Sequence, residues 1–179
     1  MELTRDDQQR LLRLAREALE ARVRKDPPPS NESGGALDWP CGAFVSIHFR
    51  GALRGCLGQV DVNAPLAETV AHLAAVVSDS DPRFSPVSVD ELADMKLEIS
   101  VLTPEREVAS SEEVEVGRHG LIVEQGYRRG LLLPQVATEH GWDREAFLSH
   151  TCRKASLPPD AWRHGARILI FEAHVFRER

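Results

Sequence analysis

The chain has 179 residues, 42% of them hydrophobic, which is enough to bury one good core, so a single domain over residues 1–179 is expected. Its net charge of -6, from 22 Lys and Arg against 28 Asp and Glu, argues against a protein that mainly wraps nucleic acid. No apolar run is long enough to span a membrane and the start "MELTRDDQQR" lacks a signal-peptide pattern, so the sequence predicts a cytoplasmic protein without a membrane partner.

The first part of the chain, residues 1–41, predicts a helix followed by a loop. Thr4 can cap a helix that runs to about Arg24, because acidic residues follow it and an apolar stripe begins soon after. The stripe consists of Leu12, Ala15, Leu19 and Val23. The stretch "PPPSNESGGALDWP" is rich in Pro, Gly and Ser and predicts a surface loop with little core to bury.

The remaining body, residues 42–179, predicts strands separated by helices. "AFVSIHF" alternates as a half-buried strand does, and the turn at Arg50 and Gly51 returns the chain into a second strand, "ALRGCLGQV". The later expected elements are a helix in "LAETVAHLAAVVSDS", a short helix "VDELADM" capped by Ser88, a strand "KLEISVL", a hairpin "LIVEQGYRRGLLLP" ended by Pro134, a helix "REAFLSHTCRK" capped by Asp143, and one long last strand "ARILIFEAHVF". Two local hairpins and this order predict an α+β fold with mainly antiparallel sheet.

Metal chemistry has little support in the sequence. The three cysteines, Cys41, Cys56 and Cys152, show no CxxC spacing, and the seven histidines show no HxxxH or HExxH spacing. We therefore expect free thiols and no metal site, and the sequence names no cofactor.

Cys56 has the most unusual surroundings. On a strand, Arg54 lies on the same side two residues earlier and would favour the thiolate, while Gly55 and Gly58 would let a ligand approach the backbone near the sulfur. The alternative is that Cys56 is a small core residue and that the glycines serve a bulge and a turn. Spacing alone favours this second interpretation, because free cysteine is among the most often buried residues.

The stretch "DPRFSPV" allows two interpretations of equal weight. Arg83 could bind a carboxylate or phosphate through its planar guanidinium. Alternatively, Asp81 and Arg83 fasten the loop by local hydrogen bonds while Phe84 fills the core.

Three further residues are weaker candidates. His119 lies between glycines in "VGRHGLIV", where it would be accessible as a base or ligand, although such histidines more often only tolerate an unusual backbone angle. Gln135 follows a strand end and could orient a ligand there, or it could simply begin a helix. Lys154 more often covers apolar surface than catalyses.

Taken in order, six motifs resemble the AMMECR-type domain, also called AmmeMemoRadiSam system protein A. They are "FVSIHFRGALRGCLGQV", "DPRFSPV", "ISVLTP", "VGRHGLIV", "LLLPQVATEHGWD" and "FLSHTCRKASL", and the match runs from roughly Phe44 to Phe176. The resemblance implies an α+β fold with a larger and a smaller lobe that are interleaved in sequence, both built on antiparallel sheet flanked by helices, with a cleft between them.

The resemblance also implies site residues and partners. Arg54, Gly55, Cys56 and Gly58 would occupy the family's LRGC signature turn, and Asp81, Arg83, Phe84, His119, Gln135 and Lys154 match its other motif positions. Gln135 is Glu in some members, so it would not be an obligatory charged base. The resemblance also implies that, in microbes, a protein of this kind is encoded beside a Memo-like protein and a radical SAM enzyme.

Three functions follow as expectations. The leading one is a cytoplasmic accessory component whose cleft, lined by the LRGCLG turn, binds a small anionic or peptide-like ligand. In that reading Cys56 is the nucleophile or redox thiol of any chemistry and His119 its base or orienter, Arg54 and Arg83 bind anions, and Gln135 positions the ligand. The rival is a non-catalytic module that docks a partner protein by strand addition. Nucleic-acid binding is the least favoured, because the basic stretches "ARVRK", "YRRG" and "CRK" are short and far apart.

Overall fold

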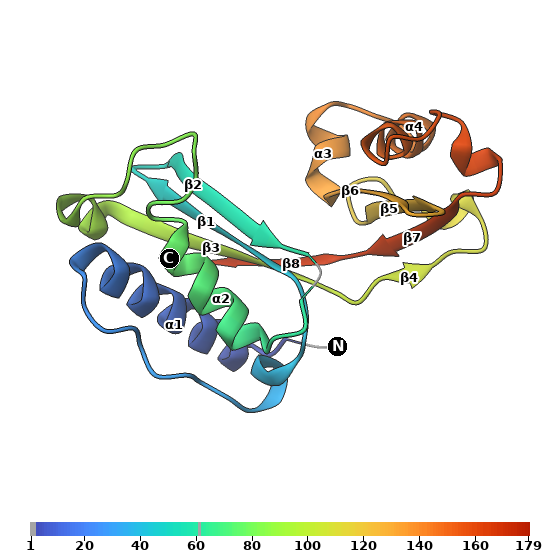
Figure 1. Ribbon diagram of the computed structural model, residues 1–179. Helices are drawn as coiled ribbons and strands as arrows, with labels where there is room; N and C mark the ends of the chain where they lie inside the picture. The colour runs from blue at the N-terminus through green and yellow to red at the C-terminus, as the bar shows by residue number, and fades with distance from the viewer. Residues whose placement is uncertain (1–2, 61) are drawn as a thin grey trace. The chain divides into compact units, whose positions relative to one another are not determined.

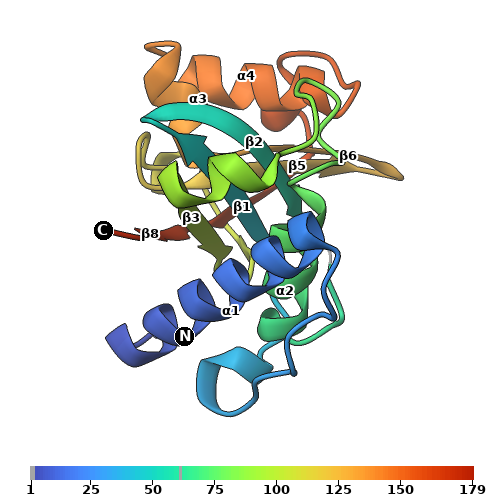
Figure 2. The ribbon, with the colours of Figure 1, turned by 90° about the vertical axis from the view of Figure 1, so that its left-hand side faces the viewer.

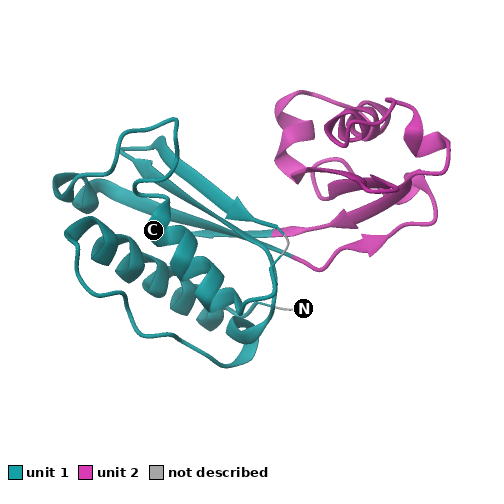
Figure 3. Ribbon diagram, viewed as in Figure 1, with its two compact units in different colours: residues 1–102, 174–179 teal, residues 103–173 magenta. Residues whose placement is uncertain are grey.

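The computed structural model describes residues 3–60 and 62–179, and the chain divides into two compact units (Figure 3). The first unit comprises residues 1–102 and 174–179, and the second comprises residues 103–173. The second unit is thus an insertion between two strands of the first, and the two parts are interleaved in sequence. A single domain over the whole chain stays a prediction.

The first unit is a four-stranded sheet with two helices on one face (Figures 1 and 2). The strand order is β2-β1-β3-β8, with β1 at Ala43–Phe49, β2 at Ala52–Gln59, β3 at Met95–Leu102 and β8 at Ala173–Arg177. The helices are α1 (Arg5–Arg24) and α2 (Leu66–Val76), and the short 3₁₀ helix η2 (Val89–Asp94) leads into β3. β1 pairs antiparallel with β2, as the hairpin pattern predicts, and also with β3.

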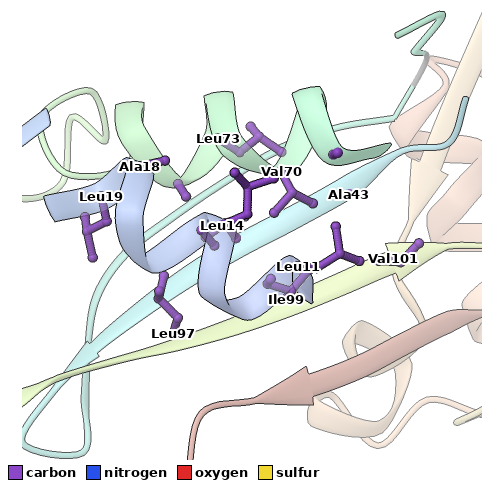
Figure 4. Close-up of a cluster of buried hydrophobic side chains, with 14 of the residues drawn as sticks. Leu11, Leu14, Ala18, Leu19, Ala43, Val70, Leu73, Leu97, Ile99 and Val101 are labelled. Carbon is purple, nitrogen blue, oxygen red and sulfur yellow. The ribbon is translucent and has the colours of Figure 1, made fainter. Parts of the chain in front are cut away.

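The core of the first unit lies between the two helices and the sheet (Figure 4). Alternate residues of β1 and β3 face the helices and are fully buried, which explains the period-two pattern in both sequences. The residues labelled in the figure are Leu11, Leu14, Ala18, Leu19, Ala43, Val70, Leu73, Leu97, Ile99 and Val101. The buried stripe of α1 therefore centres on Leu11, Leu14 and Ala18, whereas the expected Leu12 and Val23 are only half-buried at its border.

The start of α1 is capped as the sequence predicts. The Thr4 hydroxyl accepts a hydrogen bond from the Asp7 backbone N–H at 3.1 Å, and the Asp7 carboxylate accepts from the Thr4 N–H at 3.0 Å. Ser88 caps η2 with Glu91 in the same reciprocal way, although this short helix is 3₁₀ rather than α.

The loop after α1 buries more than its composition predicts. Residues 35–38 form the 3₁₀ turn η1 (Gly35–Asp38), and Ala36 and Leu37 within it are buried in the core of the first unit. The expectation of a loop with little core to bury is wrong there, because two apolar residues in a polar stretch contact α1 and α2.

The second unit has its own sheet and its own core. The strand order is β4-β7-β5-β6, with β4 at Arg106–Glu107, β5 at Gly120–Gln125, β6 at Arg128–Leu132 and β7 at Arg167–Phe171. Two helices, α3 (Pro134–Glu139) and α4 (Arg144–Lys154), pack on one face of it (Figure 1), and two short 3₁₀ helices complete the unit, η3 (Ser111–Glu113) and η4 (Ala161–Arg163). Phe147 and Leu148 of α4 are fully buried against Leu121 and Ile170 of the sheet.

The single long last strand predicted for residues 166–176 is wrong. The chain forms β7 in the second sheet and β8 in the first, with a break at Glu172. At this break the Glu172 N–H donates to the Thr103 hydroxyl at 2.8 Å, and the Thr103 N–H donates to the Glu172 carbonyl at 2.8 Å. Residues 168–171 are buried on both strand faces, so hydrophobicity does not reveal where the chain changes sheets.

The α+β class with two antiparallel sheets and flanking helices is thus confirmed. Among the residues that the structure describes, no helix has the length and apolar character needed to cross a membrane.

Candidate functional site

Cys56 lies in β2, the edge strand of the first sheet, and the LRGCLG segment is a strand rather than a turn. Cys56 lies opposite Ser46 and Gly55 opposite Ile47, but the next pair joins Leu53 to His48, so Arg54 is the extra residue of a β-bulge. Neither glycine of the motif has the positive φ that a tight turn would require. The expected signature turn is therefore wrong, and the bulge half of the alternative interpretation is confirmed.

The two glycines of the motif make room for the protein's own side chains. A Cβ atom at Gly55 would lie 3.0 Å from the carbonyl oxygen of Val77, at the end of α2. A Cβ atom at Gly58 would lie 2.2 Å from the ring of Phe44, its partner across the hairpin. Close packing thus explains both glycines. Val77 and Phe44 fill the space that the glycines leave, so the expectation that a ligand approaches the backbone there is not supported.

Asp81 and Arg83 hold the free edge of β2 at Cys56. The Cys56 N–H donates to Asp81 Oδ2 at 2.9 Å, and Arg83 Nη2 donates to the Cys56 carbonyl at 3.5 Å. Arg83 also grips Asp81 with two bonds, Nε to Oδ1 at 3.0 Å and Nη2 to Oδ2 at 2.7 Å. An edge strand leaves the outward N–H and carbonyl groups unpaired, and at Cys56 Asp81 and Arg83 satisfy both of these groups.

The Asp81 carboxylate is held in its ionised form. Only 3% of its side chain is exposed, and burial alone would favour the neutral acid. The hydrogen bond from Arg83, assisted by those from the Cys56 and Arg83 N–H groups, outweighs burial and holds the pKa of Asp81 well below its usual range. The Asp81 carboxylate thus stays charged at any pH near neutral.

The thiol of Cys56 lies on the sheet face opposite the helices and is half-exposed. Ser46 Oγ lies 3.1 Å from Sγ and donates to it. Both backbone groups of Cys56 point away from β1, so the two residues form a non-hydrogen-bonded pair, in which side chains approach closely. Cys41 and Cys152 are buried instead; burial raises the pKa of Cys41 to about 11 and also raises the pKa of Cys152. Cys56 is thus the thiol that a reagent in water can reach.

Arg54 does not serve the thiol. Its Nε donates to Glu91 Oε1 at 2.8 Å, and its Nη1 donates to the Ser85 carbonyl at 2.7 Å. Its side chain is only 15% exposed, and it holds the pKa of Glu91 below its usual range. The predicted role in stabilising a Cys56 thiolate is not supported, because this guanidinium ties the 85–91 segment to the bulge.

Arg83 remains available to a ligand. Its side chain is 58% exposed, and Nη1 makes no hydrogen bond to any residue that the structure describes, while Nε and Nη2 are occupied. The guanidinium carbon lies 5.4 Å from the centre of the Phe84 ring. Phe84 is half-buried beside Arg83 and lies outside the buried core, so its expected role as a core plug is wrong. The predicted fastening of the loop by Asp81 and Arg83 is confirmed.

The remaining candidates lie in the second unit. His119 is buried beside a cavity, which contradicts the expected accessible position in a turn. Gln135 is an exposed second residue of α3, which is the helix-entry alternative, and Lys154 is the exposed last residue of α4. The structure therefore brings together Cys56, Asp81, Arg83 and Phe84, but neither Gln135 nor Lys154 lines the cavity at His119. Within residues 3–60 and 62–179, no three His, Cys, Asp or Glu side chains gather as metal ligands would.

Two residues of the site escape sequence reasoning. Ser46 contacts the thiol and Glu91 binds Arg54, and both are distant from the motif along the chain. The alternation of β1 places Ser46 on the same face as Cys56, so the register of the hairpin could have revealed it. The capping-box pattern at Ser88 identifies Glu91 as a helix-start residue, but nothing in it indicates a second bond to Arg54.

Comparison with known proteins identifies the family. The AMMECR1 family model matches residues 12–176. A protein of Methanosarcina mazei is 41% identical over 99% of this chain and 94% of its own length, and Protein MK0488 of Methanopyrus kandleri is 40% identical over 98% and 90%. The crystal structure of the uncharacterized protein PH0010 from Pyrococcus horikoshii is 40% identical, with a TM-score of 0.76 over 94% of this chain and 90% of that one. On this evidence, and in agreement with the order of its motifs, the chain belongs to the AMMECR1 family.

Proposed function

We propose that this protein is a cytoplasmic accessory component of the AmmeMemoRadiSam system that binds a small anionic or peptide-like ligand at the Cys56 edge of the first unit. A Memo-like protein and a radical SAM enzyme are its proposed partners. The resemblance of the six motifs supports membership of this system, and the geometry around Cys56 supports an anionic or peptide-like ligand.

The observation that carries the ligand class is the fixed, half-exposed guanidinium of Arg83, which contacts the backbone carbonyl of Cys56, a residue whose thiol is half-exposed. Asp81 fixes the orientation of Arg83 through two hydrogen bonds, so little side-chain entropy is lost when a ligand binds. The two N–H groups of Nη1 stay available, and they suit one oxygen of a carboxylate or phosphate. The ligand's anionic group would then lie beside Cys56, whose carbonyl already contacts Arg83.

Binding is better supported than catalysis at this site. Ser46 is a hydrogen-bond donor to the sulfur rather than a base, and the carboxylates nearest to the motif, Asp81 and Glu91, are engaged with arginines. A nucleophilic thiol also needs a base to take its proton, and none of these three side chains is free to do so. Strand addition at Cys56 is also disfavoured, because Asp81 and Arg83 occupy the backbone groups that an added strand would use.

Alkylation with a charged and a neutral reagent tests the anion site directly. Iodoacetate carries a carboxylate and iodoacetamide does not, so Arg83 should accelerate only the first reagent at Cys56. We expect Arg83→Gln to slow alkylation by iodoacetate about fivefold, with less than about a twofold change for iodoacetamide. Inorganic phosphate should compete with iodoacetate in the wild-type protein, and peptide mass spectrometry assigns the label to Cys56.

The matched control is Arg50→Gln, which removes an exposed arginine that also donates through Nε to an aspartate in the first unit. This variant should leave the ratio of the two alkylation rates unchanged. If Arg83→Gln changes both rates equally, or if Arg50→Gln has the same effect, the proposed anion site is wrong.

A further inference from the structure

The cavity beside His119, of about 510 Å³, lies wholly within the second unit. It is lined by Thr103 and Glu172, the two residues that exchange hydrogen bonds at the break between β7 and β8, and by a buried histidine. The other lining residues are Pro104, Arg106, Glu113, Glu115, Arg118, Ile170 and Phe171. None of the polar residues among them takes part in the proposed anion site.

His119 presents an unused hydrogen-bond donor at this cavity. Its side chain is 7% exposed, and Nδ1 accepts a hydrogen bond from the Glu115 N–H at 3.1 Å. A neutral imidazole that accepts at Nδ1 carries its proton on Nε2. The nearest carboxylate oxygen to Nε2, Oε1 of Glu172, is 3.9 Å away, which is too far for a hydrogen bond. The Nε2–H group has no acceptor among the described residues and keeps contact with solvent in the cavity, so an acceptor atom brought by a ligand can reach it.

The charges around the cavity are unequal. Arg118 donates to Glu172 Oε1 from Nε at 3.0 Å, and Arg106 donates to Glu113 Oε2 at 3.0 Å. Glu115 lies only at the limit of hydrogen bonding to Arg118, with both of its oxygens 3.4 Å from Nη1. Two guanidiniums thus face three carboxylates, and Glu115 is the carboxylate least satisfied by the protein. This imbalance favours a ligand that carries a positive charge.

The backbone holds His119 and Glu115 in a fixed relation. The His119 N–H donates to the Glu115 carbonyl at 3.0 Å, and Gly117 between them has a φ of 88°, which a side chain would strain. Directly after His119, a Cβ atom at Gly120 would lie 2.2 Å from the ring of Phe171, so this strand start is packed tightly on β7. A site assembled on such contacts is pre-organised for its ligand.

We propose that this cavity binds a small molecule with an amide carbonyl and a protonated amine. The carbonyl oxygen accepts from His119 Nε2–H, and the ammonium group pairs with the carboxylate of Glu115. The binding step is non-covalent and does not depend on the Cys56 site.

NMR titration with L-alaninamide, which has both groups on a small frame, tests this proposal in the full-length protein. We expect saturable shifts of the His119 imidazole nitrogens and of backbone amides in residues 103–120 and 170–172, with a dissociation constant in the millimolar range. Acetate, which has an acceptor but a negative charge, should bind this cavity at least about fivefold more weakly.

Two variants separate the roles of the carbonyl and the amine. In His119→Asn the shorter amide oxygen can still accept from the Glu115 N–H, but the Nε2 donor is lost, so we expect alaninamide to bind about fivefold more weakly. Glu115→Gln should weaken alaninamide by a similar factor of about five, because the charge pairing is lost. The control Glu145→Gln removes an exposed carboxylate of the same unit that pairs with Arg163 outside the cavity, and it should leave the affinity unchanged.

Three results would overturn the proposal. They are alaninamide shifts that do not saturate or that map outside the cavity, acetate binding more tightly than alaninamide, and Glu115→Gln binding as tightly as the wild type. If His119→Asn does not fold, the Glu115→Gln variant, at an exposed residue, and the comparison with acetate still test the proposal. Alkylation at Cys56 stays unchanged in these variants, so failure here is distinguishable from failure of the anion site.

Discussion

Asp81 is the residue through which the Cys56 segment is held to its loop. Its carboxylate accepts from the backbone of Cys56 and from the backbone and side chain of Arg83, and it is almost fully buried. A buried carboxylate is stabilising only while such bonds compensate its lost hydration. The stability of this part of the molecule should therefore depend on the charge of a single carboxyl group.

The pH dependence of the free energy of unfolding tests whether stability depends on the charge of Asp81. The pKa of Asp81 is lowered in the folded state, so its contribution is present above the unfolded pKa of about 4 and is lost as the pH falls towards the folded value. We expect Asp81→Asn to lower the free energy of unfolding by about 2 kcal/mol at neutral pH, and by progressively less below about pH 4. Urea unfolding over a pH series measures both.

The control for this prediction is Asp79→Asn, two residues earlier. Asp79 pairs with Arg22 at the surface, and its side chain is ten times as exposed as that of Asp81, at 32% against 3%. Surface pairs contribute little, so this substitution should cost no more than about 1 kcal/mol. Equal effects of the two substitutions would contradict the role given to Asp81.

At the scale of the element, the bulge in β2 decides what Arg54 does. A strand without it would place Arg54 on the same face as Cys56, two residues away, as the sequence predicts. The extra residue changes the direction of this side chain, and the guanidinium reaches Glu91 and the carbonyls of Ser85 and Pro86. Arg54 thus joins the edge strand to the segment that leads into η2.

Arg54→Gln tests whether this arginine serves the loop or the thiol. We expect faster amide hydrogen exchange in residues 85–94, because the bonds to Glu91 and to the two carbonyls are lost. The rate of Cys56 alkylation by iodoacetamide should change by less than about twofold at each pH, because this guanidinium does not contact the sulfur. A marked upward shift of the pH profile of alkylation would instead show that Arg54 activates the thiol.

At the scale of the whole molecule, the two chain ends close the first unit. Glu178 accepts from Arg16 Nε at 2.9 Å and from the Leu97 N–H at 2.9 Å, so the C-terminal segment joins α1 to β3 across most of the sequence. Arg16 adds a bond to the Met95 carbonyl at 2.8 Å. The second unit has a separate core and none of these contacts.

This organisation predicts a unit-specific effect of Glu178→Gln. We expect the substitution to cost the first unit about 2 kcal/mol, because a charged and partly buried hydrogen-bond acceptor is weakened. Residue-resolved hydrogen exchange should show reduced protection in α1, β1 and β3 and unchanged protection in β5 and α4. Loss of protection in both units would show instead that they unfold together.

Much of the fold and part of the site follow from the sequence. Helix caps such as Thr4, the alternation of β1 and β3, and the hairpin at Arg50 and Gly51 depend on residues close together in the chain, and all are confirmed. The order of the six motifs predicts the family for the same reason, since it is a property of the linear chain. The α+β class follows from the succession of these elements.

Tertiary structure alone decided the rest, because it depends on contacts between residues that are distant along the chain. The binding of Arg54 to Glu91 and the contact of Gly58 with Phe44 are such contacts, and so is the exchange of hydrogen bonds between Thr103 and Glu172 that splits the last strand. A local pattern records which residues prefer burial, but not which neighbour fills the space. Thus the amino-acid sequence determined most of the elements and the family, and it singled out the Cys56 segment as a candidate site. Only the folded chain showed that Arg54 serves a loop, while Arg83 contacts the Cys56 carbonyl and keeps Nη1 free of bonds to the described residues.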